Sequence, residues 1–112
     1  MIFSLSFIPI KKDKVEELAS TILFYSPNII QAGTYDNNED VETTSVNTIL
    51  VTSIDVSEDM IYDITKSLFE NLDTLVSTHN AANNISLDTY DVGVPIPFHT
   101  GAEKYYKEVI KK

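Results

Sequence analysis

The chain has 112 residues, of which 43% are hydrophobic, and its 17 acidic residues against 8 basic ones give a formal net charge of −9. This length fits one domain that buries roughly two thirds of its unfolded surface. The negative charge repels nucleic-acid phosphates, so we expect no nucleic-acid partner. Cysteine is absent, which excludes a thiol nucleophile and a disulfide frame. Arginine is also absent, so the chain offers no bidentate clamp for a carboxylate.

The N-terminal part predicts a strand followed by a helix. The opening residues, MIFSLSFIPI, alternate apolar and small polar side chains, carry no preceding cation and are too short to span a bilayer. We therefore expect a strand from Phe3 to Ile10 and no signal peptide in this chain. An apolar stripe at helical spacing follows, formed by Val15, Leu18, Ala19, Ile22 and Leu23. This helix should end near Tyr25, because Pro27 disfavours helical geometry at Ser26.

The middle of the chain predicts two strands and a long helix. Ile29 and Ile30 indicate a short strand, and a polar turn from Asp36 to Glu42 follows. The segment SVNTILVTS, Ser45 to Ser53, has the β-branched composition of a central strand. Ser57 is a suitable helix cap. Apolar residues then line one helix face to about His79, namely Ile61, Ile64, Leu68, Leu72, Leu75 and Val76.

The C-terminal part predicts a stiff strap and a last helix. Pro95 and Pro97 restrict residues 94–98 to extended conformations. Thr100 and Glu103 have the spacing of a capping box. The helix after them has an apolar stripe formed by Ala102, Tyr105, Tyr106, Val109 and Ile110. Alternating strands and helices predict an α/β fold with a few strands, one long helix and a docked C-terminal helix.

Three segments of the chain resemble a known family of transport receptors. The run GVPIPFHTGAEKYYKE is similar to the C-terminal signature of the TAXI family of solute receptors of tripartite ATP-independent periplasmic (TRAP) transporters. The earlier segments YSPNIIQAGTY and TTSVNTILVTSIDVSEDMIYDITKSLFENLD resemble that family in the same order. The resemblance extends from about Phe7 to Glu108. It departs at Gln31 and Thr100, where the family usually has proline.

The resemblance implies a periplasmic receptor of the type II binding-protein kind, with two α/β lobes that close over a small organic acid or amino acid. Such a receptor delivers its ligand to the membrane permease subunits of an ion-gradient-driven transporter, and it has neither a reaction nor a cofactor of its own. Residues 1–112 would form a single α/β domain, the C-terminal portion of that receptor. Within it, the resemblance suggests Tyr35 and Thr44 as ligand contacts. A clamp for a ligand carboxylate would have to come from elsewhere in the receptor, so we expect weak binding by this chain alone.

Other types of site fit the sequence less well. Asp36, Asn38 and Asp40 have the alternate spacing of a calcium loop, but Val41 and Asn47 occupy the positions that need glycine and a bidentate glutamate.

His99 and Glu103 lie four residues apart and could share a metal, yet His99 precedes the predicted helix and is expected to be a hydrogen-bonded packing residue. Acidic pairs such as Glu16 and Glu17 are adjacent and diverge in space. We therefore expect no metal site and no catalytic residues.

The alternative function is that of an autonomous interaction module. Its aromatic C-terminal helix, with Tyr105 and Tyr106, would dock on a partner or form a homo-oligomer through exposed apolar surface. A small acid-base enzyme ranks last, because no convergent pair of titratable groups is evident.

Overall fold

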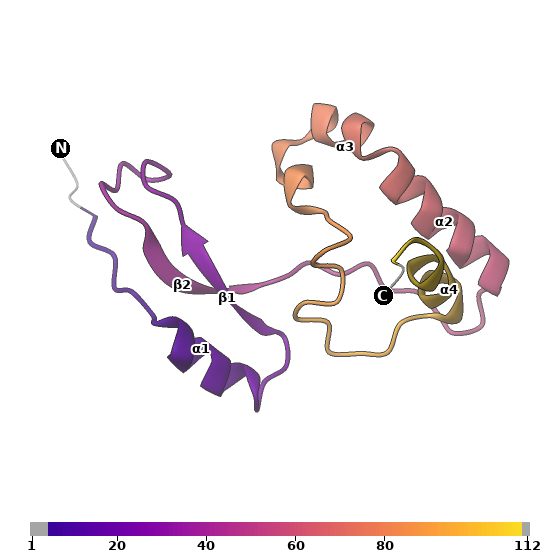
Figure 1. Cartoon of the computed structure of the whole chain (residues 1–112), viewed down its shortest axis with the longest axis horizontal. Coiled ribbons are helices and arrows are strands. Elements are labelled where there is room, and N and C mark those ends of the chain that lie inside the picture. Colours follow the sequence, from indigo (N-terminus) through magenta and orange to yellow (C-terminus); the bar gives the residue numbers. More distant parts are fainter. Residues whose placement is uncertain (1–4, 111–112) are drawn as a thin grey trace. The chain divides into compact units, whose positions relative to one another are not determined.

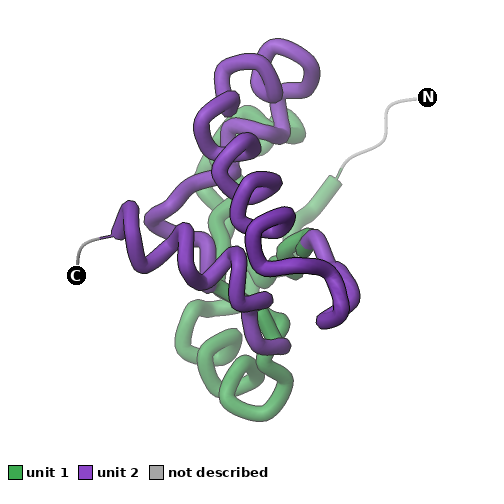
Figure 2. Tube along the Cα trace, turned by 90° about the vertical axis from the view of Figure 1, so that its right-hand side faces the viewer, with its two compact units in different colours: residues 1–49, 92–95 green, residues 50–91, 96–112 purple. Residues whose placement is uncertain are grey.

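The structure is a computed structural model that describes residues 5–110, and it divides into two compact units (Figures 1 and 2). The first unit comprises the residues up to 49 together with 92–95, and the second comprises 50–91 together with the residues from 96 onward. The described residues form four α-helices, one 3-10 helix and a two-stranded antiparallel sheet. The predicted α/β class is therefore confirmed. Within residues 5–110, every helix is too short or too polar to cross a membrane.

The first unit consists of helix α1 (Lys12–Ala19) and the hairpin of strands β1 (Tyr25–Ile30) and β2 (Val41–Val46). The strands pair in a register that runs from Tyr25 opposite Val46 to Ile30 opposite Val41. Helix α1 packs against both strands and buries Val15 completely. Between the strands, the buried Ser26 hydroxyl lies 3.1 Å from the Ser45 hydroxyl. This pair satisfies a polar group that would be costly to bury alone.

Two predictions for the N-terminal part are wrong. Residues 5–10 form no strand, and Phe3 lies outside the described residues. A hydrogen bond of 2.9 Å from the Ile10 N–H to the Glu42 carbonyl connects this segment to β2. Helix α1 ends at Ala19 instead of near Tyr25. The Ser20 hydroxyl donates to the Glu17 carbonyl, a local bond of the kind that competes with helical continuation.

The predicted central strand from Ser45 to Ser53 is also wrong. Strand β2 begins and ends earlier, and residues 47–53 have no regular secondary structure. Strand propensity describes how a side chain fits a paired surface, and only Val41–Val46 pair with β1. Beyond the strand, the Asn47 amide donates to the Val92 carbonyl at 2.8 Å. Asn47 thus connects the end of the hairpin to residues 92–95 of the same unit.

The second unit contains α2 (Glu58–Glu70), α3 (Leu72–Thr78), the 3-10 helix η1 (Asn80–Asn84) and α4 (Thr100–Val109). The predicted cap is confirmed, because the Ser57 hydroxyl accepts the Met60 N–H at 3.3 Å. The predicted single long helix is interrupted at Asn71, which has a non-helical backbone. The Asn71 side chain donates to the Ser67 carbonyl at 2.7 Å, another local bond that competes with the helix.

Helices α2 and α4 pack closely at Gly101. A Cβ atom at this position would press against the Glu58 carbonyl oxygen and lie 2.7 Å from the Tyr62 backbone nitrogen. Only glycine therefore permits the observed contact. Beside it, Ile61 and Tyr105 are buried and form the apolar centre of this unit.

Candidate functional site

Tyr35 lies in the hairpin loop, residues 31–40, which joins β1 to β2. Its side chain is 58% exposed, and its ring packs on Phe7 with a centroid separation of 5.9 Å. Asn37 holds the loop backbone: its side chain donates to the Gln31 and Glu39 carbonyls at 3.1 and 2.7 Å and accepts the Tyr35 N–H at 3.0 Å. The loop therefore fixes the backbone of Tyr35 and leaves its side chain accessible.

Thr44 lies on β2 opposite Pro27. Its half-buried hydroxyl donates to the Ser26 carbonyl at 3.4 Å. The structure thus gives Tyr35 and Thr44 different partners on different parts of the hairpin. Their role as ligand contacts stays a prediction.

Two acidic residues of the hairpin loop, Asp36 and Asp40, have structural roles in its turn. The Asp40 carboxylate accepts the Ala32 N–H at 2.8 Å, which closes the loop across its base. Asp36 has φ 61°, a left-handed conformation that Asp tolerates in turns. Across residues 5–110, no three His, Asp or Glu side chains are grouped so that they could hold a metal ion.

His99 is the N-cap of α4. Its Nδ1 atom accepts the Gly101 N–H at 3.1 Å, and its Nε2 atom lies 2.9 Å from the Val56 carbonyl oxygen. Since Nδ1 accepts, the ring hydrogen resides on Nε2 and is donated to Val56, which defines the neutral tautomer. The prediction of a hydrogen-bonded packing residue is confirmed. The prediction of a Thr100 cap is wrong, because Thr100 is the first residue inside the helix.

Polar side chains connect the exposed edges of α2 and α4. The Tyr62 hydroxyl donates to the Glu108 carboxylate at 2.7 Å, and this bond raises the pKa of Tyr62 to about 12. Lys104 lies 3.2 Å from Glu58 and 3.7 Å from Asp59, and the hydrogen bond to Glu58 is the main reason that its pKa is raised. These groups bind each other and fasten the two helices.

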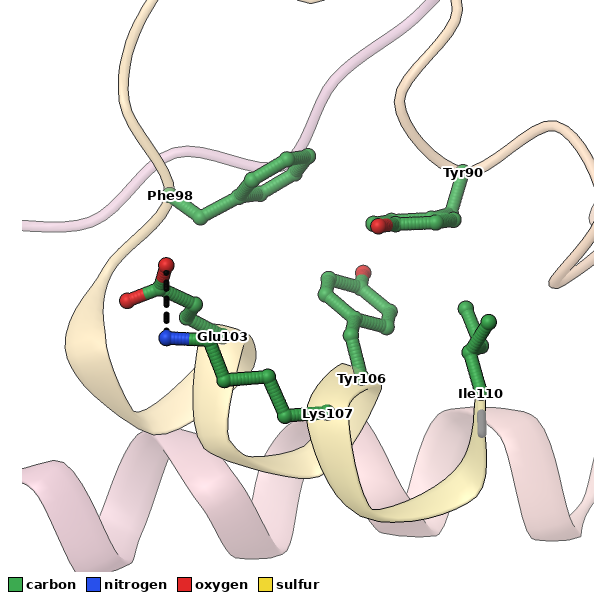
Figure 3. A pocket seen from close by; sticks show the side chains of 6 residues that line it. All are labelled: Tyr90, Phe98, Glu103, Tyr106, Lys107 and Ile110. Atoms are coloured by element: carbon green, nitrogen blue, oxygen red, sulfur yellow. Dashed lines mark ion pairs between the residues drawn. The ribbon is translucent and has the colours of Figure 1, made fainter. Parts of the chain in front are cut away.

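A pocket of about 340 Å³ lies on the opposite side of α4, and we call it the aromatic pocket (Figure 3). It is lined by Tyr90, Phe98, Glu103, Tyr106, Lys107 and Ile110. The three aromatic rings contact one another, with centroid separations of 4.2 Å for Tyr106 and Tyr90, 5.3 Å for Tyr106 and Phe98, and 5.5 Å for Tyr90 and Phe98. Burial raises the pKa of the Tyr106 phenol, and the neighbouring Tyr90 adds to this effect. The three rings are each half-buried and together form one wall of the pocket.

One ion pair borders the aromatic pocket. The Glu103 carboxylate and the Lys107 ammonium are 3.0 Å apart, one helical turn from each other (Figure 3). Both side chains are more than half exposed, and such a pair stabilises a helix by only about 0.3–0.5 kcal/mol. Glu103 and Lys107 can therefore separate and each contact a ligand at little cost in folding stability.

The sequence did not single out this pocket. Helical spacing places Tyr106 in an apolar stripe and the capping-box pattern includes Glu103, while no sequence pattern involves Tyr90. The i,i+4 spacing of Glu103 and Lys107 was a usable signal for a charge pair. The sequence gives no such signal for Tyr90, because this residue reaches α4 only through a tertiary contact between its ring and Tyr106.

The model of the NMT1-like family matches residues 3–109, which is nearly the whole chain.

Proposed function

The chain belongs to the NMT1-like family, which is periplasmic binding-protein-like, and from this we propose that it is the C-terminal part of a periplasmic solute receptor. The receptor captures a small organic acid or amino acid and delivers it to the permease subunits of an ion-gradient-driven TRAP transporter. The observation that carries the proposal is the family match over residues 3–109. The TAXI-like motifs around Tyr35 and His99 support the assignment to the transporter class.

Two features of the first unit support a role in ligand binding. The hairpin loop presents Tyr35 on a backbone that Asn37 holds in place, an arrangement that reduces the entropy lost when a ligand orders the loop. Thr44 adds a hydroxyl on the adjoining strand. We propose Tyr35 and Thr44 as ligand contacts, and the carboxylate clamp as a contribution of the remainder of the receptor.

The segment after β2 supports the assignment to a larger protein. Residues 47–53 have the composition of a central strand, yet Leu50 is 80% exposed and Val51 62% exposed. Apolar β-branched segments of this kind are stabilised by pairing and by burial against further layers. A receptor that supplies a neighbouring strand would satisfy both requirements.

The structure offers less support for the alternative function, an interaction module that docks through its C-terminal helix. Tyr105 is only 5% exposed, and its ring stacks on Phe69 at 5.9 Å. Tyr106 packs on Tyr90 and Phe98. Tyr105 therefore presents little free surface to a partner, and Tyr106 is half-buried against the rings of its own unit.

The proposal is tested by thermal-shift measurements on this chain and on the complete receptor that contains it. Glutamate, glutamine, succinate and 2-oxoglutarate serve as ligands. At a hundredfold excess over Kd, a ligand that binds only the folded state stabilises it by about 2.7 kcal/mol. We expect this shift in the complete receptor and not in the 112-residue chain.

Variants of the complete receptor test the ligand contacts. Tyr35→Phe and Thr44→Val each remove one hydroxyl and should reduce the shift, whereas Thr34→Val in the same loop serves as the control. Unchanged shifts in both variants would contradict the site assignment. A full shift in the 112-residue chain would show that the site is complete without a second lobe and would overturn the proposal.

A further inference from the structure

We propose that the aromatic pocket binds a zwitterionic amino acid with an aromatic side chain. The pocket is built only from residues of the second unit. It uses neither Tyr35 nor Thr44, so this inference does not depend on the receptor function proposed above.

The charges at the pocket border match a zwitterion. Glu103 can accept hydrogen bonds from an α-ammonium group, and Lys107 can donate to an α-carboxylate. The two side chains are already 3.0 Å apart, a separation comparable with that of the two charges of an α-amino acid. A zwitterion therefore replaces one exposed ion pair by two charge-assisted contacts. A ligand with a single charge would satisfy one side chain and leave the other without its partner.

The rings of the pocket favour an aromatic side chain. Tyr90, Phe98 and Tyr106 present faces and edges with centroid separations of 4.2 to 5.5 Å (Figure 3). A fourth ring can join such a cluster in the offset or edge-to-face geometries that aromatic pairs prefer. Ile110 extends the apolar lining. An aliphatic side chain would bury less area and lack these ring contacts.

The size of the pocket and the net charge of the chain restrict the ligand further. The volume of about 340 Å³ is at the small end of the roughly 300–1,000 Å³ that is usual for small-molecule sites. A net charge of −9 disfavours anionic ligands at long range but exerts no such force on a neutral zwitterion. Size and charge together indicate a single amino acid.

NMR titration of the ¹⁵N-labelled 112-residue chain tests the inference, with L-phenylalanine as the probe. We expect saturable shifts of amide signals between Phe98 and Ile110. Phenethylamine lacks the carboxylate, 3-phenylpropanoate lacks the ammonium group, and L-alanine lacks the ring. Each should bind about tenfold more weakly, the loss expected when one charge-assisted contact or the ring contacts are removed.

Charge-neutral variants identify the contacts. Glu103→Gln and Lys107→Gln should each weaken L-phenylalanine binding about tenfold. Lys104→Gln removes a charge from the same helix outside the pocket and should leave the affinity unchanged. The three ligand analogues give the same information on the unmodified chain, so the test does not depend on the folding of any variant.

Three results would overturn the inference. The first is the absence of saturable shifts up to the solubility limit of L-phenylalanine. The second is equal binding of L-phenylalanine and an analogue with one charge. The third is a set of shifts confined to residues outside the second unit.

Discussion

His99 combines two structural roles in one side chain. Its Nδ1 atom caps α4, and its Nε2 atom donates to the Val56 carbonyl just before α2. Ser, Thr, Asn and Asp are the usual N-cap residues because a short side chain can reach the free N–H groups of the first turn. The imidazole reaches the same N–H group and has a second nitrogen for the neighbouring segment. This second bond explains why a histidine serves here in place of a hydroxyl.

Substitutions at His99 and Thr100 test which residue caps the helix. His99→Ala removes both bonds and should lower the free energy of unfolding by about 2 kcal/mol. His99→Asn keeps a capping oxygen and loses the bond to Val56, so it should cost about half as much. Thr100→Ala should change stability by less than about 0.5 kcal/mol. Urea unfolding of the three variants measures these differences. A larger loss of unfolding free energy for Thr100→Ala than for His99→Ala would show that Thr100 caps the helix after all.

The hydrogen bond of Tyr62 should make the stability of the second unit decrease at alkaline pH. The Glu108 carboxylate accepts a hydrogen bond from the Tyr62 hydroxyl, and this bond raises the pKa of Tyr62 to about 12. In the unfolded chain, the pKa of a tyrosine phenol is about 10. The contribution is therefore fully present below about pH 10 and is lost as the pH rises toward 12.

NMR of ¹³C-labelled tyrosine, recorded across this range, follows the Tyr62 titration directly. Glu108→Gln retains an acceptor but removes the negative charge, so the pKa of Tyr62 should fall toward its ordinary value. Lys107→Gln changes the charge of a neighbouring residue that does not contact Tyr62 and serves as the control. A Tyr62 pKa that is the same in Glu108→Gln as in the unmodified chain would assign the shift to burial and not to the carboxylate.

At the scale of elements, the packing of α4 on α2 depends on Gly101, which has no side chain. A Cβ atom at Gly101 would meet the backbone of α2, which cannot rotate away as a side chain could. Alanine has the higher helix propensity by about 1 kcal/mol, but forcing the helices apart costs more. A Gly101→Ala substitution therefore distinguishes the two: helix propensity would raise the free energy of unfolding, whereas the packing conflict would lower it.

Gly101→Ala should lower the free energy of unfolding by about 2 kcal/mol. Gly33→Ala is the control for conformational strain, because Gly33 has φ 84° and its added Cβ would meet no atom within 4 Å. This second variant should cost about 1 kcal/mol through its backbone alone. Thermal or urea unfolding compares the two. Stabilisation by Gly101→Ala would mean that the two helices do not approach as closely as described.

The helices α1, α2 and α4 and the short strand at Ile29 and Ile30 could be predicted from the sequence, whereas the position of strand β2 could not. Ser57 and the apolar stripe of α2 are local signals, and the structure follows them. The strand predictions fail at residues 5–10 and 47–53 because a strand requires a partner, which a single segment does not reveal. The break at Asn71 and the cap at His99 depend on individual side-chain bonds. Of the aromatic pocket, only the charge pair on α4 had a signal in the sequence.

At the scale of the whole molecule, the two units differ in how much apolar surface supports them. In the described part of the first unit, Val15 is the one large apolar side chain that is buried. The second unit buries Ile61 and Tyr105, and the rings of Tyr62 and Phe69 pack against Tyr105. Local stability follows buried apolar contacts, so the units should open with different free energies.

Native-state hydrogen exchange of the 112-residue chain measures this difference. Amides in the middle of α2 and α4 should be protected at least about tenfold more than the paired amides of β1 and β2, which corresponds to about 1.4 kcal/mol. Val15→Ala should accelerate exchange in the hairpin and leave α2 and α4 unchanged. Equal protection throughout, with every amide slowed or accelerated together by Val15→Ala, would instead show one cooperative domain, as the length of the chain predicts. The pattern of exchange thus decides whether the division into two units is also a division of stability.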